Sequence, residues 1–140
     1  MSQNMDRFNE VTAKIFAKLY EKFPIEIDIH IDEFTDESAA DFYVAVDAGG
    51  FFLPDGDVEL VQHTVRWLVR EGYIHLECEQ MSSFAGCTLT SKGLQTLNKI
   101  PQSLDRSYGE KLIEAIKDQG TDTMKSLAKQ VLEYGTSLVF

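Results

Sequence analysis

The stretch from residue 58 to residue 97 constrains the fold more than any other part of the chain. Its first apolar residues recur at helical spacing, and Gly72 is well placed to end that helix. An alternating strand is expected over residues 73–79, and a short return strand over residues 87–89. A new helix should begin at Thr90, whose side chain is a good N-cap. The stretch therefore predicts a helix, a β-hairpin and a second helix in direct succession.

The expected hairpin also predicts where the two cysteines lie. A symmetric turn at Ser82-Ser83 places Cys78 directly opposite Cys87. Both thiols would then face the core, close together and reduced. A bulge at Gly86 would shift this pairing by one residue.

The helix expected over residues 58–70 has an inward face and an outward face. Its inward line consists of apolar side chains: Val58, Val61, Val65 and Leu68. The polar stripe contains Glu59 and four candidate contact residues: Gln62, His63, Arg66 and Arg70. Because Gln and Arg form paired hydrogen bonds with adenine and guanine edges, these four are candidates for contact with DNA or with a protein partner. The alternative interpretation is a solvated helix face without a ligand.

Before this stretch, the sequence predicts a helix, a strand and a second helix. The helix spans about residues 5–22 and ends ahead of Pro24. Residues 25–32 alternate isoleucine with polar residues, which predicts a half-buried strand with one acidic face. Thr35 or Asp36 can cap a further helix that ends at Gly49.

The acidic strand face is also a candidate cation site. It carries Glu26, Asp28, His30 and Asp32. Carboxylates and an imidazole bind divalent cations, but exposed acidic strand faces are common without one, so we assign no metal and no cofactor. The chain has no phosphate-binding glycine loop, no nucleophile elbow and no H-E-x-x-H motif. An enzyme is therefore not expected.

Charge is unevenly distributed along the 140 residues, which carry a formal net charge of -10. Residues 1–60 contain 14 acidic and four basic side chains, whereas residues 61–140 contain nine of each. An acidic surface repels nucleic acid and attracts cationic partners, and it also keeps a protein soluble. The candidate acidic partner surface consists of Glu26, Asp28, Asp32 and Glu33.

The last third of the chain predicts two more helices. Ser107 and Glu110 form a capping box ahead of the first, and Thr121 or Asp122 can cap the second. The second helix carries a wide apolar stripe that we expect to associate with a second copy, through Met124, Leu127, Val131 and Leu138. The alternative is that this helix folds back along the first helix and completes a monomeric core.

Three motifs in the middle of the chain resemble those of winged-helix repressors. They are Val65-Arg66-Trp67-Leu68, Gly72-Tyr73-Ile74 and Leu89-Thr90-Ser91-Lys92-Gly93. The whole chain also looks like a family of small uncharacterised bacterial proteins. The resemblance implies an α+β fold, with a winged-helix core over about residues 5–100 and a helical extension over about residues 107–140, in a single domain of residues 1–140. Unlike the DNA-binding members, the expected wing carries Glu77 and Glu79 and has no Lys or Arg between residues 77 and 87.

These observations favour a non-enzymatic protein-interaction or regulatory module on a winged-helix scaffold. The partner is expected to be a protein, with a homodimer formed through the C-terminal helices. One alternative is a dimeric DNA-binding regulator, and another is an acidic inhibitor of a basic partner protein. The N-terminus does not resemble a signal peptide and no apolar run is long enough to span a membrane, so we expect a cytoplasmic protein that does not bind membranes.

Overall fold

The computed structural model describes residues 3–34, 56–102, 104–118 and 120–138. These residues form five α-helices and a four-stranded antiparallel sheet, which confirms the α+β class. The elements in chain order are α1 (Gln3–Lys22), β1 (Ile27–His30), the 3-10 turn η1 (Ile31–Glu33), α3 (Gly56–Arg70), β2 (Ile74–His75), β3 (Cys78–Glu79), β4 (Ser83–Leu89), α4 (Ser91–Asn98), α5 (Tyr108–Lys117) and α6 (Thr121–Thr136). The helix expected after Thr35 or Asp36 lies outside the described residues.

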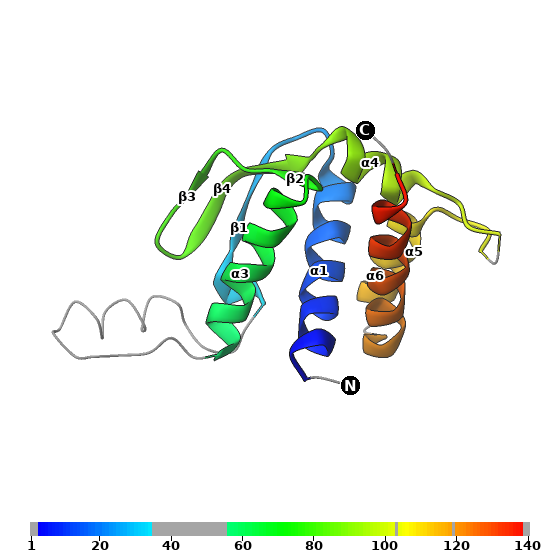
Figure 1. Cartoon of the computed structure of the whole chain (residues 1–140), viewed down its shortest axis with the longest axis horizontal. Coiled ribbons are helices and arrows are strands. Elements are labelled where there is room, and N and C mark those ends of the chain that lie inside the picture. Colours follow the sequence, from blue (N-terminus) through cyan, green and yellow to red (C-terminus); the bar gives the residue numbers. More distant parts are fainter. Residues whose placement is uncertain (1–2, 35–55, 103, 119, 139–140) are drawn as a thin grey trace, which may run out of the picture.

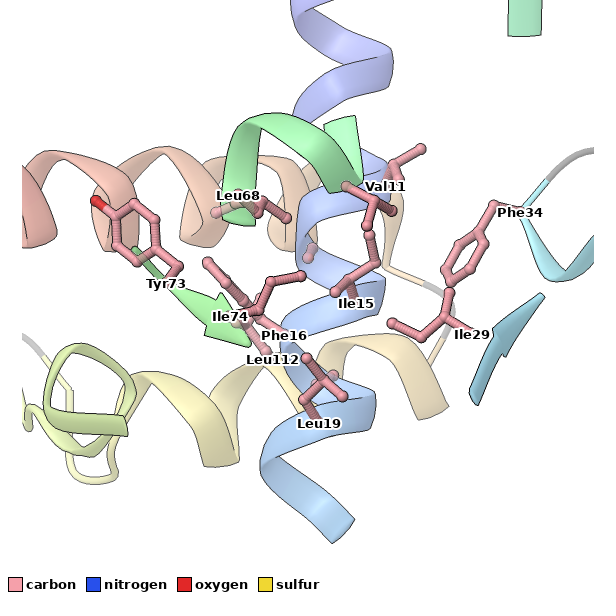
Figure 2. Close-up of a cluster of buried hydrophobic side chains, with 14 of the residues drawn as sticks. Val11, Ile15, Phe16, Leu19, Ile29, Phe34, Leu68, Tyr73, Ile74 and Leu112 are labelled. Carbon is pink, nitrogen blue, oxygen red and sulfur yellow. The ribbon is translucent and has the colours of Figure 1, made fainter. Parts of the chain in front are cut away.

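Helix α1 occupies the middle of the molecule. Helices α3, α1 and α6 lie side by side, and α1 also packs against α5 and against strands β1 and β4 (Figure 1). Because neighbours surround it, nearly every residue from Val11 to Leu19 is buried, and only Lys14 and Lys18 keep substantial exposure. Figure 2 shows Val11, Ile15, Phe16 and Leu19 within the cluster of buried side chains from the surrounding elements. None of the described helices has the length and apolar character needed to cross a membrane.

Strand β4 is the centre of the sheet, with β1 on one side and β2 and β3 on the other. The strand expected over residues 25–32 is shorter than the alternating pattern indicated. Ile29 is buried as expected, but Ile25 is 66% exposed, and Ile31 belongs to η1. The strand ends at His30, where the chain turns into η1, but the alternation of burial continues, with Ile31 buried and Asp32 exposed.

The hairpin register differs from the symmetric turn expected at Ser82-Ser83. Cys78 pairs with Ala85, and the amide of Gln80 donates to the carbonyl of Ser83 at 2.8 Å, so the turn is one residue earlier. The predicted Cys78–Cys87 pairing is therefore wrong.

A bulge in β4 explains why Cys87 faces the core. Phe84 and Cys87 are both buried although they are three residues apart, which an alternating strand does not allow. The pairing of β1 with β4 shifts between Ile27 and Ile29, and Gly86 has a φ of 66°. This irregularity in the pairing with β1 puts an extra residue between the two buried side chains. The hairpin pairing itself keeps one register across Gly86, so the one-residue shift expected there does not occur. Cys78, expected in the core, is instead exposed.

Helix α6 completes the core of the single chain. It packs against α1 and α5, and Met124, Leu127 and Val131 are buried there, while Leu138 is half-buried. Those three side chains are therefore covered by the chain itself, as in the folded-back alternative. Ser107 caps α5 as expected, with the Glu110 amide donating to its hydroxyl at 3.2 Å, but the Glu110 carboxylate accepts from that same hydroxyl at 3.1 Å, so only the N-cap half of the predicted capping box is seen. The N-cap of α6 is Gly120 and not Thr121 or Asp122.

The intramolecular position of α6 predicts a large effect of Leu127→Asp. Leu127 is only 6% exposed, so the substitution removes buried apolar contacts and places a carboxylate in the core. Removing the leucine side chain alone costs about 2–5 kcal/mol of unfolding free energy, and the buried charge adds to this. Urea denaturation measures the loss, and Ser126→Asp, at the exposed neighbouring position, is the control. A folded Leu127→Asp protein of normal stability but halved mass in light scattering would instead place Leu127 at a dimer interface.

The two cysteines should differ in reactivity. Burial, together with the Asp28 and Glu26 carboxylates, raises the pKa of the Cys87 thiol from 9.0 to about 11. Its protonated form is thus stabilised by folding, and that contribution to stability is lost as the pH rises from 9.0 through about 11. At mildly alkaline pH we expect a disulfide reagent to label Cys78 rapidly and Cys87 only after unfolding. Cys78→Ser should remove the fast phase, and fast labelling that persists in this variant would contradict the burial of Cys87.

Candidate functional site

An open groove with a volume of about 730 Å³ runs between the first turns of α1 and the outer face of α3. The two helices lie next to each other, so each supplies one wall (Figure 1). Asn4, Met5 and Phe8 line it from α1, and the rest of the lining comes from α3 between Glu59 and Arg70.

Aromatic rings form the apolar part of the groove. Phe8 meets Trp67 edge to face, with ring centroids 5.4 Å apart and an interplanar angle of 87°. Trp67 also stacks on Tyr73 at 6.3 Å, and Tyr73 is only 1% exposed. The buried tyrosine thus supports the half-buried tryptophan from behind. Met5, which is 50% exposed, adds a flexible apolar side chain to the same groove.

Charged side chains of α3 line the polar part of the groove. The Arg66 guanidinium binds the Glu79 carboxylate of β3 through two hydrogen bonds, Nε–Oε1 at 3.0 Å and Nη2–Oε2 at 2.6 Å. His63 Nε2 lies 3.9 Å from Glu59 Oε1 one turn earlier. Arg70 is exposed and forms no ion pair with any part of the chain that the structure describes. The groove therefore combines an aromatic surface with one guanidinium fixed by the hairpin and another accessible to a ligand.

Gln62 does not belong to this set, although the sequence analysis placed it on the outward stripe. It is 8% exposed and therefore buried. The reason is its position: Gln62 follows Val58 by four residues and precedes Val65 by three, so it lies on the inward line of the helix. Its polarity suggested that it faces outward, but its spacing from Val58 and Val65 places it on the inward face. His63, Arg66 and Arg70 remain together along the groove.

The candidate acidic surface is exposed, but its carboxylates are partly used within the fold. The Asp28 carboxylate accepts a hydrogen bond from the Gly86 amide at 3.1 Å. Glu33 pairs with Lys18 and accepts from the His30 amide at 2.8 Å. Glu26 lies ahead of β1, and Asp32 lies in η1, beyond the end of the strand, so the four residues do not share one strand face.

The contribution of α1 to the groove was missed by the sequence analysis. Phe8 and Trp67 are large apolar residues of the kind expected in the core, yet each is only half-buried. Met5 precedes Phe8 by three residues and extends the apolar stripe of α1 by one turn beyond the part that the core covers. That extra turn is the signal that was available in the sequence.

Comparison of this chain with protein-family models, with curated proteins and with solved structures gives no match. An aromatic surface beside exposed guanidinium groups suits an apolar side chain flanked by carboxylates.

The Arg66–Glu79 pair should be visible in the titration of Glu79. Hydrogen bonding to Arg66 holds the pKa of the Glu79 carboxyl below its ordinary value. The pair therefore stabilises the fold fully at a pH above the ordinary pKa of a glutamate, and this stabilisation is lost as the pH falls through the lowered pKa. Arg66→Ala should raise the pKa of Glu79, measured by carbon-detected NMR. Arg70→Ala is the matched control one turn along α3 and should leave it unchanged. An identical Glu79 titration in the wild type and in Arg66→Ala would mean that the pair does not form in solution.

Proposed function

We propose that this protein is a non-enzymatic interaction module that binds a segment of a partner protein in the groove between α1 and α3. The observation that carries the proposal is the open groove of about 730 Å³ with Phe8 and Trp67 on its apolar side. Tryptophan, methionine and arginine are the residues enriched at protein interfaces, and this groove contains all three. Two neighbouring helices commonly bind an amphipathic helix in the groove that they form.

The charges of the groove favour a partner segment that carries carboxylates beside its apolar side chains. The Arg70 guanidinium is exposed, and guanidinium groups bind carboxylates through two parallel hydrogen bonds. His63 and Arg66 lie along the same side of α3. A segment with an apolar stripe and acidic flanking residues would contact both the aromatic surface and these groups.

The scaffold that we propose for this module is a winged helix. In support, the strand order is β1-β4-β2, and α3 directly precedes the hairpin formed by β2, β3 and β4. In that scaffold α3 takes the position of the helix that contacts DNA in repressors. Helices α5 and α6 are then an extension packed against α1.

The alternative functions receive less support from the same residues. For DNA binding, Gln62 is buried, Arg66 is already bound to Glu79, and the hairpin offers no Lys or Arg to phosphates. For an acidic inhibitor, Asp28 and Glu33 already accept hydrogen bonds from the chain itself. Peptide binding in the groove receives more support, because the aromatic side chains already form an apolar surface that is open to solvent.

Trp67 is the only tryptophan in the sequence, so its fluorescence reports directly on the groove. We expect an amphipathic helical peptide of about four turns, with a leucine stripe and glutamate flanks, to shift the Trp67 emission to shorter wavelength at micromolar concentration. The same peptide with lysine flanks, or with its sequence scrambled, should bind at least several-fold more weakly. Arg70→Glu should weaken the binding of the glutamate peptide, whereas Arg106→Glu, an exposed charge reversal on the segment before α5, should not.

Equal weakening by the two charge reversals would contradict a role for the groove. So would an unchanged Trp67 emission at millimolar peptide. A salt-dependent emission change with random-sequence duplex DNA, absent with the peptides, would favour the nucleic-acid alternative.

A further inference from the structure

Three side chains of the types that bind metal ions lie close together on the sheet, away from the groove. They are Glu26, just before β1, His75 of β2 and Glu77, just after β2, and all three are exposed. One ligand atom of each, two carboxylate oxygens and an imidazole nitrogen, lies within 4.8 Å of the other two. His75 Nε2 and Glu77 Oε2 are 4.0 Å apart. Donor atoms about 2.0–2.2 Å from a tetrahedral zinc ion lie about 3.4 Å from one another, so small rotations of these exposed side chains would bring all three atoms within reach of one ion.

The three residues come from opposite sides of the central strand, and Gly86 lets them meet. β1 and β2 both pair with β4, so a side chain on β4 would normally stand between them. Gly86 lies at this point with a φ of 66°, and a Cβ there would be 2.6 Å from Glu77 Cβ and 3.6 Å from Glu26 Oε1. The glycine therefore keeps clear the space that the donor atoms share.

The charge around the three residues is not balanced by the chain. Asp28 adds a further carboxylate, bound to the Gly86 amide at 3.1 Å. Among the described residues, none of Glu26, Asp28 and Glu77 forms an ion pair with Lys or Arg. A bound cation would offset the mutual repulsion of carboxylates held this close together.

We infer that Glu26, His75 and Glu77 form a binding site for a divalent transition-metal ion of the zinc type, with water completing the coordination. Calcium and magnesium prefer oxygen donors alone, whereas zinc and its neighbours readily accept one imidazole with carboxylates. The histidine therefore sets the class of metal. Because the side chains are exposed and water fills the remaining positions, the affinity is expected in the micromolar range. The site does not depend on the groove or on the function proposed for it.

Calorimetric titration with zinc chloride tests the site in the full chain. All proteins should carry Cys78→Ser, because the exposed thiol of Cys78 is itself a zinc ligand. We expect one zinc ion per chain, at least tenfold weaker binding in His75→Ala and in Glu26→Gln, and no competition from millimolar magnesium. His63→Ala is the matched control, because His63 is also exposed and lies 3.9 Å from a glutamate, but among the described residues it belongs to no group of three converging donor atoms.

NMR of the imidazole groups gives a second measurement, in a protein that keeps all three histidines. Zinc should shift the resonances of His75 at one equivalent and leave those of His63 and His30 in place. The inference is overturned if zinc does not bind at concentrations up to 1 mM, roughly the weak end of specific binding. It is also overturned if His63→Ala weakens binding as much as His75→Ala, or if zinc shifts all three histidines together.

Discussion

The fold depends on enclosing helix α1. Residues from Val11 to Leu19 are buried on almost every side of the helix, which requires neighbours all round it: α3 on one side, α5 and α6 on the other, and the sheet against the remaining face. Polar contacts then fix the two ends. Near the N-terminal end Arg7 binds Asp57 of α3 at 2.7 Å and also the carbonyl of Phe34, and at the other end the Tyr20 hydroxyl donates to Asn98 at 2.7 Å. The hairpin half and the helical half of the chain are thus held by one shared element and form a common core.

Tyr73 connects this core to the candidate groove. Its ring contacts Phe16 of α1 at 5.7 Å and Trp67 at 6.3 Å, and the Lys92 ammonium lies 4.5 Å from its ring centroid. Helix α6 can approach the tyrosine only because residue 135 is glycine, since a Cβ there would lie 2.3 Å from the Tyr73 hydroxyl oxygen. Burial raises the pKa of the Tyr73 phenol, which keeps it uncharged in this apolar setting. The position of the C-terminal helix and the orientation of the groove tryptophan therefore depend on the same buried ring.

Local features of the structure were predictable from sequence, and features that need distant residues were not. Gly72 adopts a φ of 84° after α3, and Thr90 caps α4 by accepting from the Gly93 amide, as their residue types indicated. The hairpin register was not predictable, because nothing in the sequence distinguishes a turn at residues 81–82 from one at 82–83. Gln62 shows that helical spacing outweighs polarity when the two disagree. The meeting of Glu26 with His75 and Glu77 needs β4 to pair with β1, which precedes α3 in the chain, as well as with β2 of the hairpin, and no single segment encodes both pairings.

The uneven charge of the chain bears on which ligands suit the groove. A net charge of -10 repels every polyanion at long range, yet at physiological ionic strength charges more than about 8 Å apart are largely screened from each other. A short peptide that places one or two carboxylates beside Arg70 therefore interacts mainly with the few groups around it: His63, Arg66 and the aromatic surface. A DNA duplex extends over many such lengths and would also meet the acidic hairpin, where Glu77 forms no ion pair with Lys or Arg among the described residues. For the peptide partner proposed above, screening would let this acidic protein bind a short acidic segment at the cationic groups of α3, whereas a long polyanion would meet the repulsion of a larger acidic surface.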